Sequence, residues 1–196
     1  DTLYLYGMDE LYDRIDTIYV ENDKFSYTTS VDTITSAYLL LKNRIEYPVF
    51  LDKGNKIKIK GDTINLNFLT ISGNIYNEEF TDFQKALEDP ADPSEKAGEE
   101  TVDKRITVEK ANTAEEMAEE FILQHHSSYV SLYLLDKYFV QKETPDFSKI
   151  KKLVEVMTGV LQDKPYIERL NETITQAEKS EIGKYAPFFS LPNAKG

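Results

Sequence analysis

The hydrophobic pattern of this chain changes its period after Gly73, and that change constrains the fold more than any other feature. Before this point apolar and polar residues alternate, as in Lys56–Lys60, which is the pattern of a strand with one buried face. Beyond it the apolar residues recur every three or four positions, as in an amphipathic helix. The sequence therefore predicts an α+β protein. We expect an antiparallel β-sandwich or barrel-like domain over residues 1–75 and a helical module over residues 76–182.

Turn residues divide the first part into short strands. Glu21-Asn22-Asp23 and Asp52-Lys53-Gly54-Asn55 contain the residue types that tight turns prefer, and each stands between two strand-like stretches. Short strands separated by turns at regular intervals are typical of an antiparallel sandwich. The expected strands are Thr2–Tyr6, Ile15–Val20, Lys24–Val31, Ser36–Leu41, Tyr47–Leu51, Lys56–Lys60 and Ile64–Ser72.

Five helices are predicted in the second part from apolar residues on one face and from capping residues at the ends. Residues 88–104 are acidic and contain two prolines, so we expect an exposed linker or a poorly ordered loop there. The first expected helix is capped by Asn77 and has Phe80, Phe83 and Leu87 on its apolar face. The second ends near His126 and starts either at Thr113, which has capping-box spacing to Glu116, or earlier. The others are expected over Ser128–Gln141, after Thr144-Pro145-Asp146, and from Pro165 to a C-cap at Gly183.

The composition excludes several classes of function. The net charge is −12 and the pI is about 4.7, so nucleic acid and anionic membrane surfaces are not expected partners. The chain contains no cysteine, which excludes disulfides, zinc–thiolate sites and thiol nucleophiles within it. The longest apolar run, Ala37–Leu41, is far too short to span a bilayer.

His125 and His126 are the only histidines of the chain. Adjacent residues on a helix point about 100° apart, whereas a helical metal pair is usually four residues apart. At the end of a helix, imidazoles can instead meet the free backbone carbonyls. We therefore expect these two side chains to have a capping role.

Two further charged clusters have simple structural interpretations. The acidic residues Glu115, Glu116, Glu119 and Glu120 lack the closed loop that a hard-cation site needs, so a solvated helix face is expected. The alternation in Lys56–Lys60 places the isoleucines in the core and the lysines in water.

The Tyr-rich strands could present an aromatic surface to sugar or peptide, but burial in the sheet explains them more simply. We expect no catalytic, cofactor-binding or metal-binding residue and no cofactor.

The last fourteen residues, GKYAPFFSLPNAKG, resemble the opening of a known group of thioredoxin-fold proteins. The group comprises the alkyl-hydroperoxide-reductase and thiol-specific-antioxidant proteins, including the TlpA-like thiol–disulfide oxidoreductases. Ala186, Pro187, Phe189, Leu191 and Gly196 occupy the pattern, whereas Phe188 stands where a polar residue is usual. The resemblance implies that residues 183–196 contain the first strand of a thioredoxin-like domain, which is truncated before its Cys-x-x-Cys motif.

The preceding residues are similar to a domain of unknown function, followed by a helical connector, found at the N-terminus of such oxidoreductases. The similarity rests on Leu51–Asn55, Lys56–Lys60 and Ser72–Asn77, and on the stretch FILQHHSSYVSLYLLDKYF. The connector usually contains an Asn-Pro-x-Ser turn, and His125-His126-Ser127-Ser128 lacks its proline. Most of residues 1–87 and 117–196 are covered. These domains usually begin with a further strand upstream of the Asp-Thr-Leu-Tyr-Leu segment, so the resemblance leaves open whether the domain starts at Asp1 or before it.

This resemblance implies a parent protein in a Gram-negative envelope, often a membrane-anchored lipoprotein in the periplasm. The chain would then be a non-catalytic accessory region that spaces the redox domain from the membrane, recruits a protein partner or substrate, or forms a homodimer. Membrane contact would come only through an anchor outside this chain. A free-standing envelope module that binds a glycan or peptide is one alternative, and a solvent-exposed row of Tyr would favour it. A hydrolase using carboxylates alone is another, but the sequence nominates no acidic pair.

Overall fold

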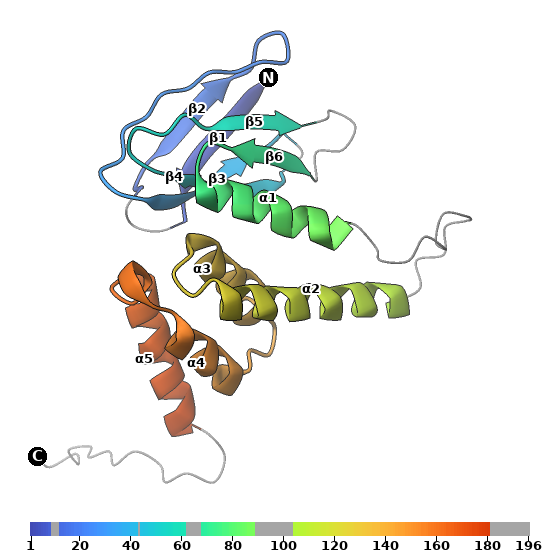
Figure 1. Cartoon of the computed structure of the whole chain (residues 1–196), viewed down its shortest axis with the longest axis vertical. Coiled ribbons are helices and arrows are strands. Elements are labelled where there is room, and N and C mark those ends of the chain that lie inside the picture. Colours follow the sequence, from blue (N-terminus) through green and yellow to red (C-terminus); the bar gives the residue numbers. More distant parts are fainter. Residues whose placement is uncertain (9–11, 43, 62–67, 89–103, 181–196) are drawn as a thin grey trace, which may run out of the picture.

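The computed structural model describes residues 1–8, 12–42, 44–61, 68–88 and 104–180. It confirms the predicted α+β class, because antiparallel strands occupy the N-terminal part and helices follow them (Figure 1). The strands are β1 Thr2–Gly7, β2 Ile15–Tyr19, β3 Thr35–Leu40, β4 Glu46–Leu51, β5 Lys58–Gly61 and β6 Leu69–Ser72.

The described strands form two antiparallel sheets. The larger sheet has the order β2-β1-β3-β4, and β5 pairs with β6 in the smaller one. The register of the larger sheet places Leu5 opposite Leu39 and Ala37 opposite Val49, so these side chains share one face and are buried in the core. Pro48 lies in β4, an end strand of the larger sheet, which is where a residue without a backbone N–H is tolerated.

The hairpin turn after β2 is confirmed, but the strand predicted over Lys24–Val31 is wrong. Glu21 and Lys24 exchange both backbone hydrogen bonds, at 2.9 and 3.0 Å, and the ladder stops after this single rung. The segment beyond Lys24 is held through side chains instead, since Arg14 bonds the Thr29 hydroxyl and the Ser30 carbonyl. Strand propensity in this segment is therefore overridden by tertiary hydrogen bonds.

Helix α1, Ile75–Glu88, covers the edges of two strands with polar side chains. The Asn77 amide accepts from the Phe50 N–H at 3.0 Å and donates to the Phe50 carbonyl at 2.8 Å. One turn further on, the Thr81 hydroxyl bonds both the N–H and the carbonyl of Ile71. The predicted cap at Asn77 is wrong, because the Asn74 side chain accepts from the Asn77 N–H while Asn77 itself reaches β4.

The helical module follows from α2 onward. Ser128 and Asp146 cap α3 and α4, where Ser128 and the Pro145-Asp146 turn are expected to start helices. Of the two starts considered for the long helix, the earlier one is correct, because α2 begins at Lys104 and the capping-box spacing at Thr113 lies inside it. The elements are α2 Lys104–Gln124, α3 Tyr129–Leu135, the π-helical turn η2 Asp136–Val140, α4 Phe147–Val156, the 3₁₀ turn η3 Gly159–Leu161, and α5 Pro165–Ser180.

Aromatic side chains join α1 to the helical module. The rings of Phe80 and Tyr133 are 5.2 Å apart between centroids, and those of Tyr76 and Tyr129 are 5.3 Å apart. Both pairs are edge-to-face, the favourable arrangement for packed aromatic rings. The helical module therefore packs directly beside the sheets, and α5 points away from them (Figure 1).

Some sequence predictions fall on residues outside those that the structure describes, among them residues 64–67 of the strand predicted over Ile64–Ser72. The linker predicted over residues 88–104 lies outside the described residues, apart from its two end residues. The strand predicted within residues 183–196 and the C-cap at Gly183 also lie outside them.

Candidate functional site

The large apolar side chains that are most exposed on the strands lie together on β2 and β1. Ile15 is 74% exposed, Tyr19 is 72% exposed and Tyr4 is 41% exposed. The register places Thr17 opposite Tyr4, so these side chains emerge from the same face of the sheet. We call Tyr4, Ile15, Thr17 and Tyr19 the open row. The row has exposed apolar side chains at both ends of β2 and the Thr17 hydroxyl between them.

Helices cover the rest of this sheet face. The ring centroid of Tyr38 on β3 lies 6.4 Å from that of Tyr133 on α3, and that of Phe50 on β4 lies 6.3 Å from that of Tyr76 on α1. Tyr6 stands at the boundary, and its hydroxyl donates to Glu46. Burial, and then the neighbouring Glu46 carboxylate, raise the pKa of Tyr6. The helical module therefore ends where the open row begins.

Strand β2 also presents an unpaired backbone edge. On one side, the Val20 N–H donates to the Asp1 carbonyl at 2.9 Å next to β1. Because backbone groups alternate sides along an antiparallel strand, Ile15, Thr17 and Tyr19 direct their N–H and C=O groups away from β1. Within the described part of the chain, these outward groups have no hydrogen-bond partner. Such a row is a template for pairing with another extended segment.

A polar cluster supports β2 from its other face. Tyr12, which is buried, donates to the Asp16 carboxylate, and Arg14 lies 3.1 Å from that carboxylate. Partial burial raises the pKa of Asp16, but hydrogen bonds from Tyr12 and Tyr27 and the charge of Arg14 outweigh it and lower the pKa. Burial and the bond to Asp16 raise the pKa of Tyr27 to about 12. Thr29 belongs to the same cluster, since its hydroxyl lies 3.4 Å from that of Tyr12.

The open row and the bare edge coincide in the same three residues of β2. Their side chains offer apolar contact on the sheet face, and their backbone offers hydrogen bonds at its edge. This combination suits the addition of an extended peptide strand, in which backbone bonds give affinity and alternate side chains give specificity. The arrangement is one for binding rather than for proton transfer or nucleophilic attack.

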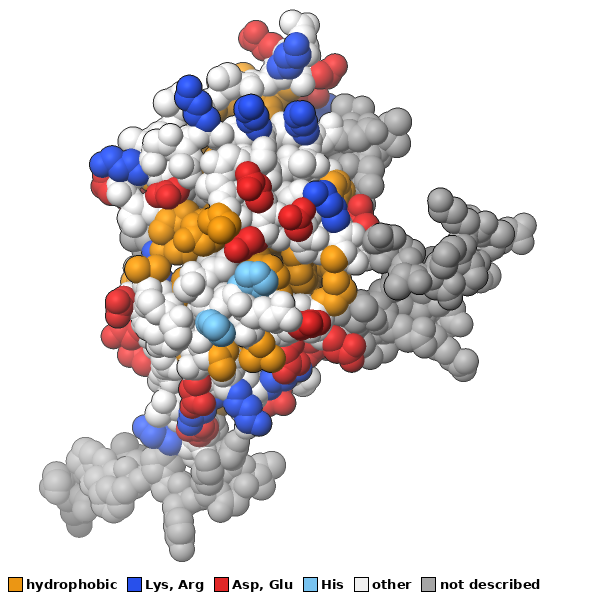
Figure 2. Space-filling view, in the orientation of Figure 1, with side chains coloured by type: hydrophobic (Ala, Val, Ile, Leu, Met, Phe, Trp, Pro, Cys, Tyr) orange, Lys and Arg blue, Asp and Glu red, His pale blue; other side chains and the backbone are white. Residues whose placement is uncertain are grey.

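The two histidines lie at the end of α2, as the sequence predicts. The His125 ring stacks on Phe121 with centroids 4.1 Å apart, and its Nδ1 lies 3.1 Å from the Phe121 carbonyl. This is the predicted contact with a helix-end carbonyl. His126 is exposed, and Figure 2 shows both imidazoles at the surface.

The acidic residues of α2 are only partly a solvated face. Glu119 lies 2.8 Å from Lys149, and Glu115 pairs with both Lys142 and Lys149. Partial burial raises the pKa of Glu115, but the two lysines lower it by a larger amount. The predicted solvated face is therefore correct for Glu116 and Glu120, which are exposed. It is wrong for Glu115 and Glu119, which join α2 to the start of α4.

The lysine alternation around β5 is confirmed. Ile57 and Ile59 pack against the core, while Lys56, Lys58 and Lys60 are exposed. Figure 2 shows basic side chains gathered over this end of the molecule and acidic ones over α1. Lysines on an end strand discourage edge-to-edge pairing, so β5 differs from β2, which carries Ile15 and Tyr19.

A polar cluster in the helical module was missed by the sequence analysis. The Tyr166 hydroxyl donates to Asp136 at 2.5 Å, and Gln141 donates to the same carboxylate at 2.6 Å. Burial, followed by the bond to Asp136, raises the pKa of Tyr166. The contacts tie α5 to η2 across thirty residues of sequence, a pairing that no local motif signals. We interpret the cluster as structural.

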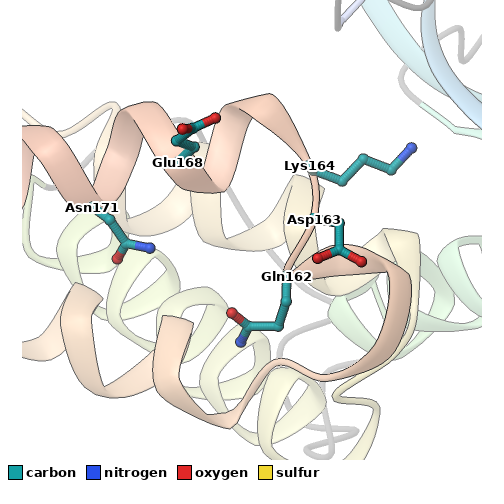
Figure 3. A pocket seen from close by; sticks show the side chains of 5 residues that line it. All are labelled: Gln162, Asp163, Lys164, Glu168 and Asn171. Atoms are coloured by element: carbon teal, nitrogen blue, oxygen red, sulfur yellow. The ribbon is translucent and has the colours of Figure 1, made fainter.

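A shallow hollow of about 410 Å³ lies before and along the first turns of α5. The Gln162 amide donates to the Val154 carbonyl at 3.2 Å, and the Lys164 ammonium lies 4.8 Å above the Tyr129 ring. Figure 3 shows the carboxylates of Asp163 and Glu168 pointing in different directions. A carboxylate hydrolase needs two acids that face each other across the substrate, so this hollow does not favour that class of enzyme.

No group of three or more His, Cys, Asp or Glu side chains among the described residues is arranged to hold a metal ion. None of the helices found there is long and apolar enough to cross a membrane.

Comparison with known proteins gives one match. Residues 1–80 match the model of a family described as a domain of unknown function, DUF4369. The matched part is less than half of the chain, and it contains all six described strands and the first residues of α1. Neither the curated proteins nor the solved structures gave a match to the chain.

Proposed function

We propose that this chain is a non-catalytic accessory region of an envelope thiol:disulfide oxidoreductase, and that it recruits a protein partner or substrate at the open row and the bare edge of β2. The observation that carries the proposal is the exposure of Ile15 and Tyr19 beside unpaired backbone groups. Exposed apolar side chains that form a contiguous strip are typical of interaction sites.

Two sequence observations support the oxidoreductase context. The first is the resemblance of most of residues 1–87 and 117–196 to the N-terminal regions of TlpA-like oxidoreductases. The C-terminal stretch resembles the start of a thioredoxin-like domain. On this proposal the parent protein is a periplasmic or envelope protein anchored in the membrane through a segment outside this chain.

The arrangement of the modules supports a spacing role as well. Strand β2 lies toward one end of the molecule, and the C-terminal end of α5 lies at the other (Figure 1). A redox domain that followed α5 would therefore be held away from the partner site. A partner bound at β2 would be presented at a distance set by the helical module.

The test compares two substrates of the parent oxidoreductase. Ile15→Ser combined with Tyr19→Ser should slow the reduction of a disulfide-bonded protein substrate and leave the reduction of a small aromatic disulfide unchanged. Lys53→Ser, an exposed change in the turn before β5, serves as the control. Equal rates with the protein substrate in all three proteins would contradict the proposal, and so would thiol exchange by this chain alone.

A free-standing module that binds a glycan or peptide is a second candidate. The exposed rings of Tyr4 and Tyr19, with the Thr17 hydroxyl between them, favour it, because aromatic faces stack on sugar rings and peptides. Reading the coding sequence beyond Gly196 separates the two candidates. A thioredoxin-like frame with Cys-x-x-Cys supports the accessory region, and a stop codon near Gly196 supports the free-standing module.

A further inference from the structure

The turn after β2 has the geometry that starts a regular two-residue hairpin. Asn22 and Asp23 both have positive φ angles, 51° and 60°. Two such residues form the type I′ turn that matches the twist of paired strands, and Asn and Asp tolerate this conformation well. Glu21 and Lys24 close the turn with two hydrogen bonds. The register of any continuation is therefore already set.

Continuing that register assigns a partner to each unpaired residue of β2. Glu21 opposite Lys24 places Tyr19 opposite Ser26, Thr17 opposite Thr28, and Ile15 opposite Ser30. These three residues of β2 carry the outward N–H and C=O groups that have no partner among the described residues.

The side chains of Phe25–Ser30 already occupy positions close to this register. In it, Tyr27 and Thr29 would lie on the face of β2 that carries Asp16. Tyr27 does bond the Asp16 carboxylate, and Thr29 contacts both Tyr12 and Arg14. The segment is thus aligned along β2 by its side chains, and only the backbone ladder is absent.

We propose that Phe25–Ser30 is a strap that closes onto β2 as a fifth strand of the larger sheet. Its sequence, FSYTTS, is rich in the aromatic and β-branched residues that suit a strand and contains neither Gly nor Pro. Closing satisfies the outward groups of Ile15, Thr17 and Tyr19, and opening frees them. A partner strand at β2 then competes with the strap for the same groups, a consequence that rests on the proposed function.

An engineered disulfide in the full chain tests the register of the strap. The chain has no cysteine of its own, so Thr17→Cys with Thr28→Cys introduces the only two thiols. Thr17→Cys with Ser26→Cys is the matched control, on the same face but displaced by two residues. Directly opposite Cα atoms are about 5.5 Å apart, within disulfide range, and diagonal ones are about 7–8 Å apart.

In a glutathione redox buffer, the first pair should oxidise at least about ten times faster than the control. All three positions are exposed, so each variant should keep the circular dichroism spectrum of the parent chain. Equal rates for the two pairs would overturn the proposal, because they would show a segment with no fixed register.

A peptide with the sequence of residues 24–31, KFSYTTSV, tests the competition. It should bind the reduced Thr17→Cys/Thr28→Cys chain and bind the oxidised chain at least tenfold more weakly. Equal binding to both forms, or to neither, would overturn the competition between strap and strand. The proposed function is tested separately by the side-chain variants of the open row, so the two can fail independently.

Discussion

The two end strands of the larger sheet, β4 and β2, differ in the hydrogen bonding of their outer backbone groups. At the outer edge of β4, the Asn77 amide takes the place of a neighbouring strand at Phe50 by bonding both of its backbone groups, and Pro48 has no N–H to pair. The outer edge of β2 is bare, with Ile15 and Tyr19 exposed beside it. An unpaired edge invites association and is normally protected. Asn77 is buried, so its contacts at β4 belong to the structural core, and on the proposed function the bare edge of β2 is the partner site.

Removing the Asn77 amide should cause the largest loss in the free energy of unfolding among the changes considered. Asn77→Ala leaves the buried Phe50 N–H without an acceptor and also breaks the 2.9 Å contact with Asn74. We expect a loss of about 3 kcal/mol in the free energy of unfolding, since each buried polar group left unsatisfied costs about 1–3 kcal/mol. Urea unfolding measures the loss. Lys85→Ala, at an exposed position of the same helix, should change it by less than about 0.5 kcal/mol.

Removing the Thr81 hydroxyl, which bonds the backbone of β6 from α1, should also lower stability, but by less than removing the Asn77 amide. Thr81→Val keeps the shape of the side chain but removes the hydroxyl that bonds both backbone groups of Ile71. The expected loss in the free energy of unfolding is about 2 kcal/mol, measured in urea. Thr81→Ser, which keeps the hydroxyl, should recover more than half of it. A Val variant as stable as the parent chain would contradict the prediction, because the hydroxyl contacts with Ile71 would then add nothing to the stability of β6.

Acid should release the strap while leaving the β4 edge intact. The pKa of Asp16 is lower in the folded chain, so its contribution is present above the unfolded pKa of about 4 and is lost as the pH falls through the folded value. NMR signals of Tyr27 should therefore shift below about pH 4, and those of Asn77 should not shift with them. In Asp16→Asn the Tyr27 transition should disappear. A transition that persists in this variant would assign it to another carboxylate.

Changing the open row should have the smallest effect on stability. Ile15 and Tyr19 are exposed, so replacing both with Ser should alter the free energy of unfolding by less than about 0.5 kcal/mol. Urea unfolding and a circular dichroism spectrum check this. A loss above about 1.5 kcal/mol would show that these side chains pack in the folded chain, and the open row would then not be free for a partner.

The sequence was informative where local chemistry decides the structure. The hydrophobic period predicted the order of strands and helices, and the Glu21-Asn22-Asp23 turn was recognised from residue type. The role of Asn77 could not be found this way, because its partner Phe50 is twenty-seven residues away. Asn is a common capping residue, so the sequence indicated a cap at Asn77. In the structure its amide instead bonds the backbone of Phe50 in β4.

The candidate site was also hidden from the sequence for a physical reason. Strand β2 carries apolar residues on both faces, Ile15 and Tyr19 on one and Ile18 on the other. Alternation therefore cannot tell which face is buried, and burial of the tyrosines in the sheet was the simpler interpretation. The structure shows that Tyr12 and Tyr47 are buried while Tyr4 and Tyr19 are exposed.

Amide hydrogen exchange on the unmodified chain tests the contrast between the two edges most directly. The N–H groups of Phe50 and Ile71 have acceptors in Asn77 and Thr81, whereas those of Thr17 and Tyr19 have none in the described structure. We predict exchange at Thr17 and Tyr19 at least about a hundredfold faster than at Phe50 and Ile71. Equal protection at all four positions would contradict this contrast, because the outer backbone groups of β2 would then be paired in the resting chain and the two edges would not differ.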